Sequence, residues 1–203
     1  MLSAQAAADL LSNSSARWWL SGGAALDAWL GKPIRRRSNT DVSTTRAHLE
    51  QLLADLPTGC SPWLIVDGRA IPWATRPDNT EFRSVLIFDE QMDSWVLRVN
   101  VEDGNDLAWV YLRDPRLHVP WERAVIYRGG IPTGAPELQL VWKALRPSPE
   151  DTEDKDAVLP TLSPEARALF ETALLRIHPH STWAIHVRSP YAPGKASWDR
   201  PKR

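Results

Sequence analysis

Cysteine is almost absent from this chain of 203 residues, which contains only Cys60. A single cysteine cannot form a disulfide within the chain, so the disulfide framework of a small secreted domain is excluded. No basic residue precedes the apolar residues of the N-terminal segment 1–11, which argues against a signal peptide. We therefore expect a chain that works in a reducing compartment, the cytoplasm.

Long apolar runs and an excess of charge are also missing. No run approaches the ~18 residues that a membrane-spanning helix needs, so we expect no membrane contact. The formal net charge is −1, so the chain lacks the overall basic field that drives nonspecific nucleic-acid binding. What the sequence does contain is 43% hydrophobic residues and eleven tryptophans. That supply is sufficient for one sizeable core with a small helical appendage.

The periodicity of apolar residues divides the chain into an α+β part and a helical part. In the first part we expect helices at 4–11, 24–30 and 46–56, and strands at 18–20, 41–45, 63–66, 70–73, 85–88, 95–101, 109–112 and 124–127. In the second part we expect helices at 136–145, 150–159 and 163–177, the last with Ser163 as its N-cap. The predicted units are an α/β domain at 1–133, a C-terminal helical subdomain at 134–187, and a tail at 188–203 whose composition is typical of disorder.

The segment with the clearest chemistry begins at Ser21-Gly22-Gly23 and ends at Asp41-Val42-Ser43. A strand that ends in Gly-Gly lets backbone amides approach a phosphate, and the following helix directs its positive N-terminus to the same place. An acidic residue on the next strand can hold a divalent metal that bridges the phosphates. The alternative is that Gly-Gly is only a tight turn and Asp41 only a surface residue.

The order of several motifs resembles the aminoglycoside adenylyltransferase-like family of the polymerase-beta-type nucleotidyltransferase superfamily. The residues that carry the resemblance are Trp19 to Gly31, then Arg37, Asn39, Asp41 and Ser43, then Trp95 to Trp109 with Tyr111 and Arg113 to Arg116, and finally Gly130 to Pro132, Ala135 to Glu137, Lys143-Ala144, Asp151, Asp154 and Val158 to Pro160. They span roughly residues 18–183 in order. The resemblance implies a nucleotidyltransferase-like mixed β-sheet flanked by helices, followed by a small C-terminal helical bundle.

The resemblance also implies a reaction, the transfer of a nucleoside monophosphate from a nucleoside triphosphate to a hydroxyl of a small-molecule acceptor. ATP is the expected nucleotide and Mg²⁺ the expected metal, with Asp41 as metal ligand. Ser21, Gly22 and Gly23 would contact the phosphates. Arg37 and Lys143 would stabilise charge, and Ser43 would complete the catalytic set.

Three positions depart from the family's pattern. Ser43 and Arg98 stand where the resemblance predicts two further carboxylates, and Asn39 stands where it predicts a histidine. A hydroxyl is a much weaker Mg²⁺ ligand than a carboxylate, and a cation opposes metal binding. An ion pair between Asp41 and Arg98 is one alternative to a metal site. The other is a replacement ligand from Asp27, Glu102 or Asp103, although Glu102 lies two pleats beyond Arg98 and is expected to be too distant.

Two further charged groups allow two interpretations each. The basic run Arg35 to Arg37 is either a solvated loop or a phosphate contact, and Lys143 either meets a triphosphate or pairs with Glu137 or Asp151. The acidic residues from Glu150 to Asp156 are expected to form a solvated helix face, or to attract a cationic acceptor. The sequence therefore predicts nucleotidyl transfer at a degenerate metal site, or alternatively an inactive nucleotide-binding or regulatory module with the same fold.

Overall fold

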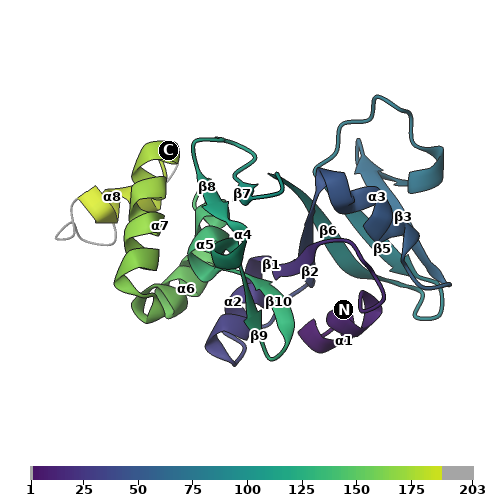
Figure 1. Ribbon diagram of the computed structural model, residues 1–203, viewed down its shortest axis with the longest axis horizontal. Helices are drawn as coiled ribbons and strands as arrows, with labels where there is room; N and C mark the ends of the chain where they lie inside the picture. Colours follow the sequence, from purple (N-terminus) through teal and green to yellow (C-terminus); the bar gives the residue numbers. More distant parts are fainter. Residues whose placement is uncertain (1, 189–203) are drawn as a thin grey trace, which may run out of the picture.

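The structure is a computed structural model that describes residues 2–188 (Figure 1). Its helices are α1 (Ala4–Leu10), α2 (Gly22–Leu30), α3 (Arg46–Ala54), α4 (Trp121–Ala124), α5 (Pro136–Lys143), α6 (Pro149–Val158), α7 (Pro164–Ile177) and α8 (Thr182–Arg188). Its strands are β1 (Trp18–Ser21), β2 (Asp41–Thr45), β3 (Cys60–Val66), β4 (Arg69–Pro72), β5 (Ser84–Asp89), β6 (Ser94–Gly104), β7 (Ala108–Val110), β8 (His118–Pro120), β9 (Val125–Arg128) and β10 (Ile131–Gly134). Helices α5 to α8 lie at the opposite end of the molecule from β3 and β5.

One mixed sheet connects the whole α/β part. Its main path runs β4-β3-β5-β6-β2-β1-β10-β9, and β7 extends from β6 with β8 beside it. Strand β2 pairs antiparallel with β1 and parallel with β6, so these three strands lie side by side at the centre of the sheet. The predicted fold class, a mixed sheet flanked by helices and followed by a C-terminal helical part, is confirmed.

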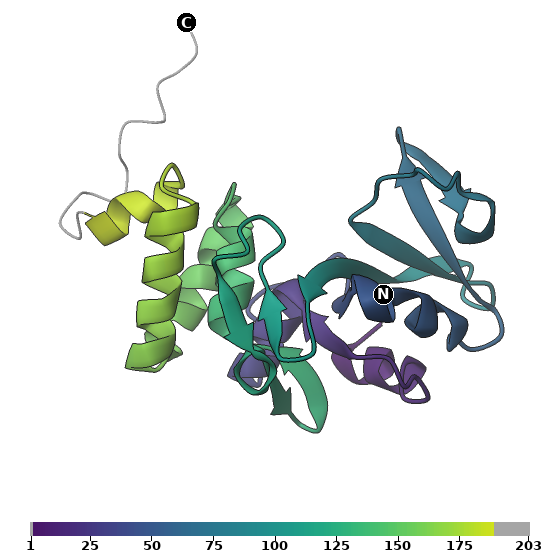
Figure 2. The same cartoon turned by 45° about the horizontal axis from the view of Figure 1, so that its top comes forward.

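Two hydrophobic clusters form the core, and β1 contributes to both. Leu20 belongs to the cluster in which α1 and α3 pack under β5 and β6 (Figure 2). Its neighbour Trp19 belongs to the second cluster, which joins α2, α5, α6 and α7. Successive side chains of a strand point to opposite faces. Leu20 and Trp19 of β1 therefore pack against helices on opposite faces of the sheet.

Helix α2 starts and stops at glycines with positive φ. Gly22 is its first residue, with φ +58°, and Gly31 ends it with φ +69°. L-residues with a side chain rarely adopt this left-handed backbone, which glycine adopts without steric cost. The Gly-Gly sequence therefore fixes the sharp change of direction from β1 into α2.

Most expected elements are confirmed, but four short ones were not expected from the sequence. Strands β8 and β10 and helices α4 and α8 each span three to seven residues. The strand β10 contains Pro132 and Gly134, residues that disfavour strands, yet it lies between β1 and β9 within the sheet. It forms a hairpin with β9 across Gly129-Gly130, but its parallel partner β1 is distant in the chain, so the local pattern does not show that it lies inside the sheet.

The structure confirms the predicted cap of α7, but it does not test the predicted domain boundaries. Ser163 caps α7 as predicted, since its Oγ accepts a hydrogen bond of 3.2 Å from the Ala166 amide. The predicted domain boundaries remain a prediction, and the tail predicted at 188–203 lies outside the described residues, apart from Arg188. None of the helices within residues 2–188 has both the length and the apolar character that a membrane crossing requires.

Truncating Leu20 tests the central position of β1. Leu20 is completely buried, so we expect Leu20→Ala to lower the free energy of unfolding by about 2–5 kcal/mol, measured by urea denaturation. The matched control is Leu107→Ala, because Leu107 is 81% exposed and should change stability by less than about 0.5 kcal/mol. Equal effects of the two changes would contradict this account of the core.

Candidate functional site

A pocket of about 270 Å³ opens at the head of α2, where the central strands meet α5. It is bordered by the end of β1, by β2 and β6, and by α5. Its lining includes Ser21, Gly22, Gly23, Asp41, Ser43, Arg83, Asn100, Glu102, Gln139, Trp142 and Lys143. Six of the seven residues named from the sequence as site residues line this pocket, and Arg37 is the seventh.

The glycine turn faces the acidic strand directly. Ser21 is in register with Asp41 across the antiparallel β1–β2 pair. A Cβ placed on Gly22 would lie 2.8 Å from Oδ2 of Asp41. Glycine at this position is thus required twice, for its backbone conformation and for the space that the carboxylate occupies.

The amide of Gly22 already has a protein partner. It donates a hydrogen bond of 2.8 Å to Oε1 of Gln139, which comes from α5. This contact joins the head of α2 to the C-terminal helices, and nothing in the sequence pattern identified Gln139. The amide expected to meet a phosphate is therefore available to one only when the Gln139 side chain rotates away.

Asp41 is a partly buried carboxylate with two unequal neighbours. The Asn39 amide donates to its Oδ1 at 2.5 Å, whereas Nε of Arg98 lies 4.0 Å away. Burial raises the pKa of Asp41, and the positive charge of Arg98 opposes that rise. The Asp41–Arg98 pair considered from the sequence thus exists, but only at the outer limit of an ion pair and with the Arg98 side chain 46% exposed.

The donors around Asp41 do not fit a pair of Mg²⁺ ions. Arg98 lies beside Asp41 in the parallel β2–β6 register, and the neighbouring position on β2 is the uncharged Ser43. Residues 2–188 contain no group of three histidine, cysteine or acidic side chains that could hold a metal. Because Mg²⁺ in phosphoryl-transfer sites relies on carboxylates, this donor set leaves Asp41 without the partners that it would need.

Ser43 and Glu102 meet below Asp41. The Ser43 hydroxyl is buried, and within the described part of the chain no atom completes a hydrogen bond with it in good geometry. It nevertheless lies close enough to Glu102 to favour that residue's carboxylate form. An unsatisfied buried hydroxyl is costly, so its position at a pocket suggests a ligand partner.

Glu102 was expected to lie too far from Arg98 to replace the missing metal ligand, and this stays a prediction. Glu102 is 3% exposed and lines the same pocket as Asp41. The indole N–H groups of Trp109 and Trp142 donate to its Oε2, at 2.5 and 3.1 Å. Burial raises its pKa.

Arg37 and Lys143 are held by acidic partners. Arg37 donates to Asp27 at 2.6 and 2.9 Å and to Asp154 at 2.7 and 2.8 Å. Lys143 lies 2.6 Å from Asp151 and 3.1 Å from Asp154. A Cβ on Gly23 would overlap the Arg37 guanidinium, so the second glycine makes room for this cation.

The prediction of a solvated acidic face on α6 was therefore wrong for Asp154. This side chain is fully buried, and Arg35 is its third cationic partner, at 3.2 Å. Burial alone would raise the pKa of Asp154, but Arg35, Lys143 and Arg37 outweigh it and lower the pKa. The basic run 35–37 is likewise no free loop, since two of its three arginines bind this carboxylate.

Comparison with known proteins agrees with the family resemblance stated from the sequence. Residues 4–61 match the model of the aminoglycoside-2''-adenylyltransferase family. Among solved structures, the chain is similar to ANT(2'')-Ia in complex with adenylyl-2''-tobramycin, with 18% identity, coverage of 94% of this chain and 95% of that one, and a TM-score of 0.46. It is also similar to an antigenic nucleotidyltransferase-like protein from Paracoccidioides brasiliensis, with 16% identity, coverage of 91% and 88%, and a TM-score of 0.42. No curated protein matches the chain.

Removing the charge of Asp154 tests the cluster. Asp154→Asn leaves three cations without their shared carboxylate, so we expect a loss of about 3–5 kcal/mol in unfolding free energy at pH 7. The folded-state pKa of Asp154 is lowered, so its contribution is present above the unfolded pKa of about 3.9 and is lost as pH falls further. The difference between wild type and variant, measured by urea denaturation, should therefore shrink as the pH falls below about 4.

Asp156→Asn is the matched control, because Asp156 lies on the same helix with its side chain 64% exposed. We expect it to change stability by less than about 1 kcal/mol. A pH-independent difference between wild type and Asp154→Asn would show that packing, not charge, carries the effect.

Proposed function

We propose that this aminoglycoside adenylyltransferase-like chain binds a nucleotide at the head of α2 without Mg²⁺, with Arg98 as the cation that meets the phosphates. The observation that carries the proposal is the position of Arg98. Its guanidinium stands beside Asp41, which lines the pocket, is about half exposed, and is only loosely paired at 4.0 Å. A guanidinium is a strong bidentate partner for phosphate oxygens.

The segment that matches the family supports a phosphate ligand. The matched residues 4–61 include β1, the glycine turn, α2 and β2, which together form one side of the pocket. The N-terminus of α2 provides a positive dipole end at Gly22 and Gly23. ATP is the nucleotide that the family resemblance implies, and it is the probe for the experiments below.

Two of the cations expected from the sequence are already neutralised. Arg37 and Lys143 share Asp154 and have further carboxylate partners in Asp27 and Asp151. Arg83, by contrast, is exposed at the pocket rim and has no ion pair within residues 2–188. The net positive charge offered to a phosphate therefore comes from Arg98 and Arg83, while Arg37 and Lys143 hold the surrounding elements in place.

Nucleotidyl transfer to a small hydroxylated acceptor is the second candidate, and Glu102 is the observation that favours it. A buried carboxyl with a raised pKa, directed beneath the pocket floor, is suited to accept a proton. In that reaction the acceptor oxygen bonds to the α-phosphorus as pyrophosphate leaves, and the hydroxyl proton passes to Glu102. The acceptor would lie against Trp142 and α5, on the side of the pocket that faces the C-terminal helices.

The first test measures the metal dependence of ATP binding by isothermal titration calorimetry. We expect binding with the same affinity, within about twofold, in Mg²⁺ and in EDTA. Arg98→Gln should weaken it about tenfold or more, because a charge-assisted contact contributes about 1.5–3 kcal/mol. Binding that requires Mg²⁺, or that is unchanged in Arg98→Gln, would overturn the proposal.

A gain-of-function variant serves as the matched control. Ser43→Asp combined with Arg98→Asp restores acidic residues at both altered positions, next to Asp41. We expect this double variant to bind Mn²⁺, detected by electron paramagnetic resonance, where the wild type does not. The same result for both proteins would mean that Ser43 and Arg98 do not determine the loss of metal binding.

The second candidate is tested by pyrophosphate release from ATP in the presence of hydroxyl-bearing acceptors. We expect release no faster than without protein, as the binding function requires. Release that disappears in Glu102→Gln, while ATP affinity is retained, would establish nucleotidyl transfer instead.

A further inference from the structure

A second, smaller pocket of about 210 Å³ lies on the other side of the Asp41–Arg98 pair. Its lining includes Asn39, Leu86, Trp95 and Arg98. Asn39 and Arg98 are the same two side chains that contact Asp41, which lines the larger pocket. The contacts of Asn39 and Arg98 with Asp41 therefore link the linings of the two pockets.

A β-bulge directs Trp95 to this face of the sheet. Along β5 and β6 the register pairs Ile87 with Leu97 and then Phe88 with Trp95, so Val96 is the additional residue. Without the bulge, Trp95 would follow the alternation of Leu97 and Val99 into the buried face. With it, Trp95 shares the face of Arg98 and Leu86. Bulges frequently occur where a sheet re-aims a side chain next to a functional site.

Trp95 is both fixed and accessible. Its ring packs edge-on against Phe88, with centroids 5.2 Å apart, and against Trp63 at 6.0 Å. Despite these contacts the residue is 43% exposed. Edge-to-face neighbours hold an indole in one orientation, and the exposed part is left for another flat ring.

The dimensions and chemistry of the smaller pocket suit an aromatic ring system. Its volume is below the ~300 Å³ of pockets that enclose a complete drug-sized ligand, so it accepts part of a ligand. Leu86 and Trp95 supply apolar walls, and Asn39 supplies an amide at the edge. Arg98, at the boundary with the larger pocket, is placed to meet an anionic group attached to that ring.

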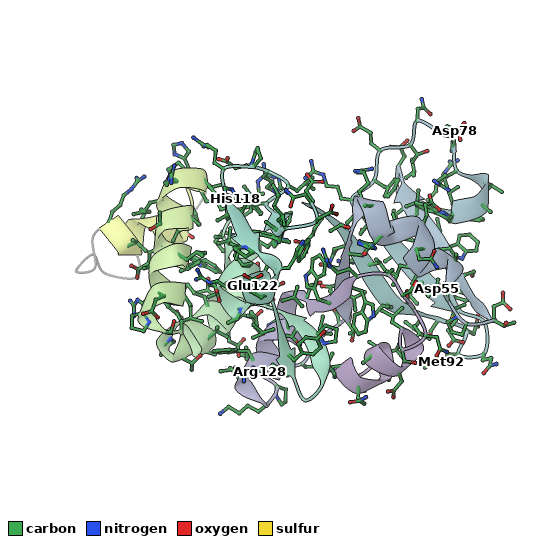
Figure 3. All side chains as sticks on the ribbon, in the orientation of Figure 1. Asp55, Asp78, Met92, His118, Glu122 and Arg128 are labelled. Atoms are coloured by element: carbon green, nitrogen blue, oxygen red, sulfur yellow. The ribbon has the colours of Figure 1, made fainter. Side chains whose placement is uncertain are left out.

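We propose that the pocket beside Trp95 is the base subsite for a nucleotide, with the base stacked on Trp95 and the phosphates extending past Arg98 to the glycine turn. This inference rests on the proposed nucleotide-binding function. It adds Trp95 as the residue that recognises the base. It predicts a preference for ligands with a flat ring over ligands with phosphates alone. Met92 lies in the turn between β5 and β6, at the end of the molecule opposite α5 to α8 (Figure 3). It does not line the smaller pocket.

The experiment compares ATP with inorganic tripolyphosphate by isothermal titration calorimetry in EDTA. Trp95→Ala should weaken ATP binding about tenfold, because stacking of a base on an aromatic ring contributes about 1–3 kcal/mol. The same variant should leave tripolyphosphate affinity within about twofold of wild type. Trp95→Phe should recover most of the loss, since it retains an aromatic face.

Tyr127→Ala is the matched control, because Tyr127 is 73% exposed and lies on β9, away from both pockets. It should change neither affinity, and circular dichroism should show that all variants are folded. Unchanged ATP binding in Trp95→Ala, or an equal loss for ATP and tripolyphosphate, would overturn the base subsite alone. Failure of both ligands to bind the wild type would overturn the proposed function itself.

Discussion

The buried carboxylate of Asp154 is the contact on which the arrangement of this molecule depends. It is fully buried and accepts contacts from Arg35, Arg37 and Lys143. A single buried charge could not be sustained without such partners, and three cations around one carboxylate could not be sustained without the outer carboxylates of Asp27 and Asp151. The network joins α6 to the loop after α2 and to α5. It thereby holds the C-terminal helices against the head of α2, where the pocket forms.

This network also determines the electrostatics of the pocket. Arg37 and Lys143 have the residue types and chain positions of phosphate contacts, but their charges are compensated within the protein. A ligand that recruited either would have to replace a short ion pair in a buried setting. Arg98 requires no such exchange, because its pairing with Asp41 is long and its guanidinium is partly in solvent. Of the three cations Arg37, Lys143 and Arg98, the one most loosely paired is thus Arg98, which contacts Asp41 of the larger pocket and lines the smaller one.

The sequence predicts most of this fold but less of the site. Strong local periodicity and glycine or serine capping identify α2, α3 and α7 with nearly correct bounds. The strand β10 escapes prediction because Pro132 and Gly134 disfavour strands, and because its own residues do not reveal its parallel pairing with the distant β1. The juxtaposition of Gly22 and Asp41 was predicted from order along the chain. The hydrogen bond of Gln139 to Gly22 was not, because it joins residues 117 positions apart.

The contacts of charged residues are even harder to predict from the sequence. The acidic pattern of α6 is typical of a solvated helix, and only the tertiary arrangement reveals that one of its carboxylates is the best-paired anion of the described chain. The reverse holds for Ser43 and Arg98, since their identities in the sequence are already sufficient to predict a weakened metal site. An arginine in place of a carboxylate beside Asp41 makes the local charge more positive by two units, which is the charge of a divalent metal ion. In the proposed complex, Arg98 would supply from the chain itself some of the positive charge that a metal would otherwise bring to a phosphate, and Trp95, re-aimed by the adjacent bulge, would give the nucleotide a second point of attachment.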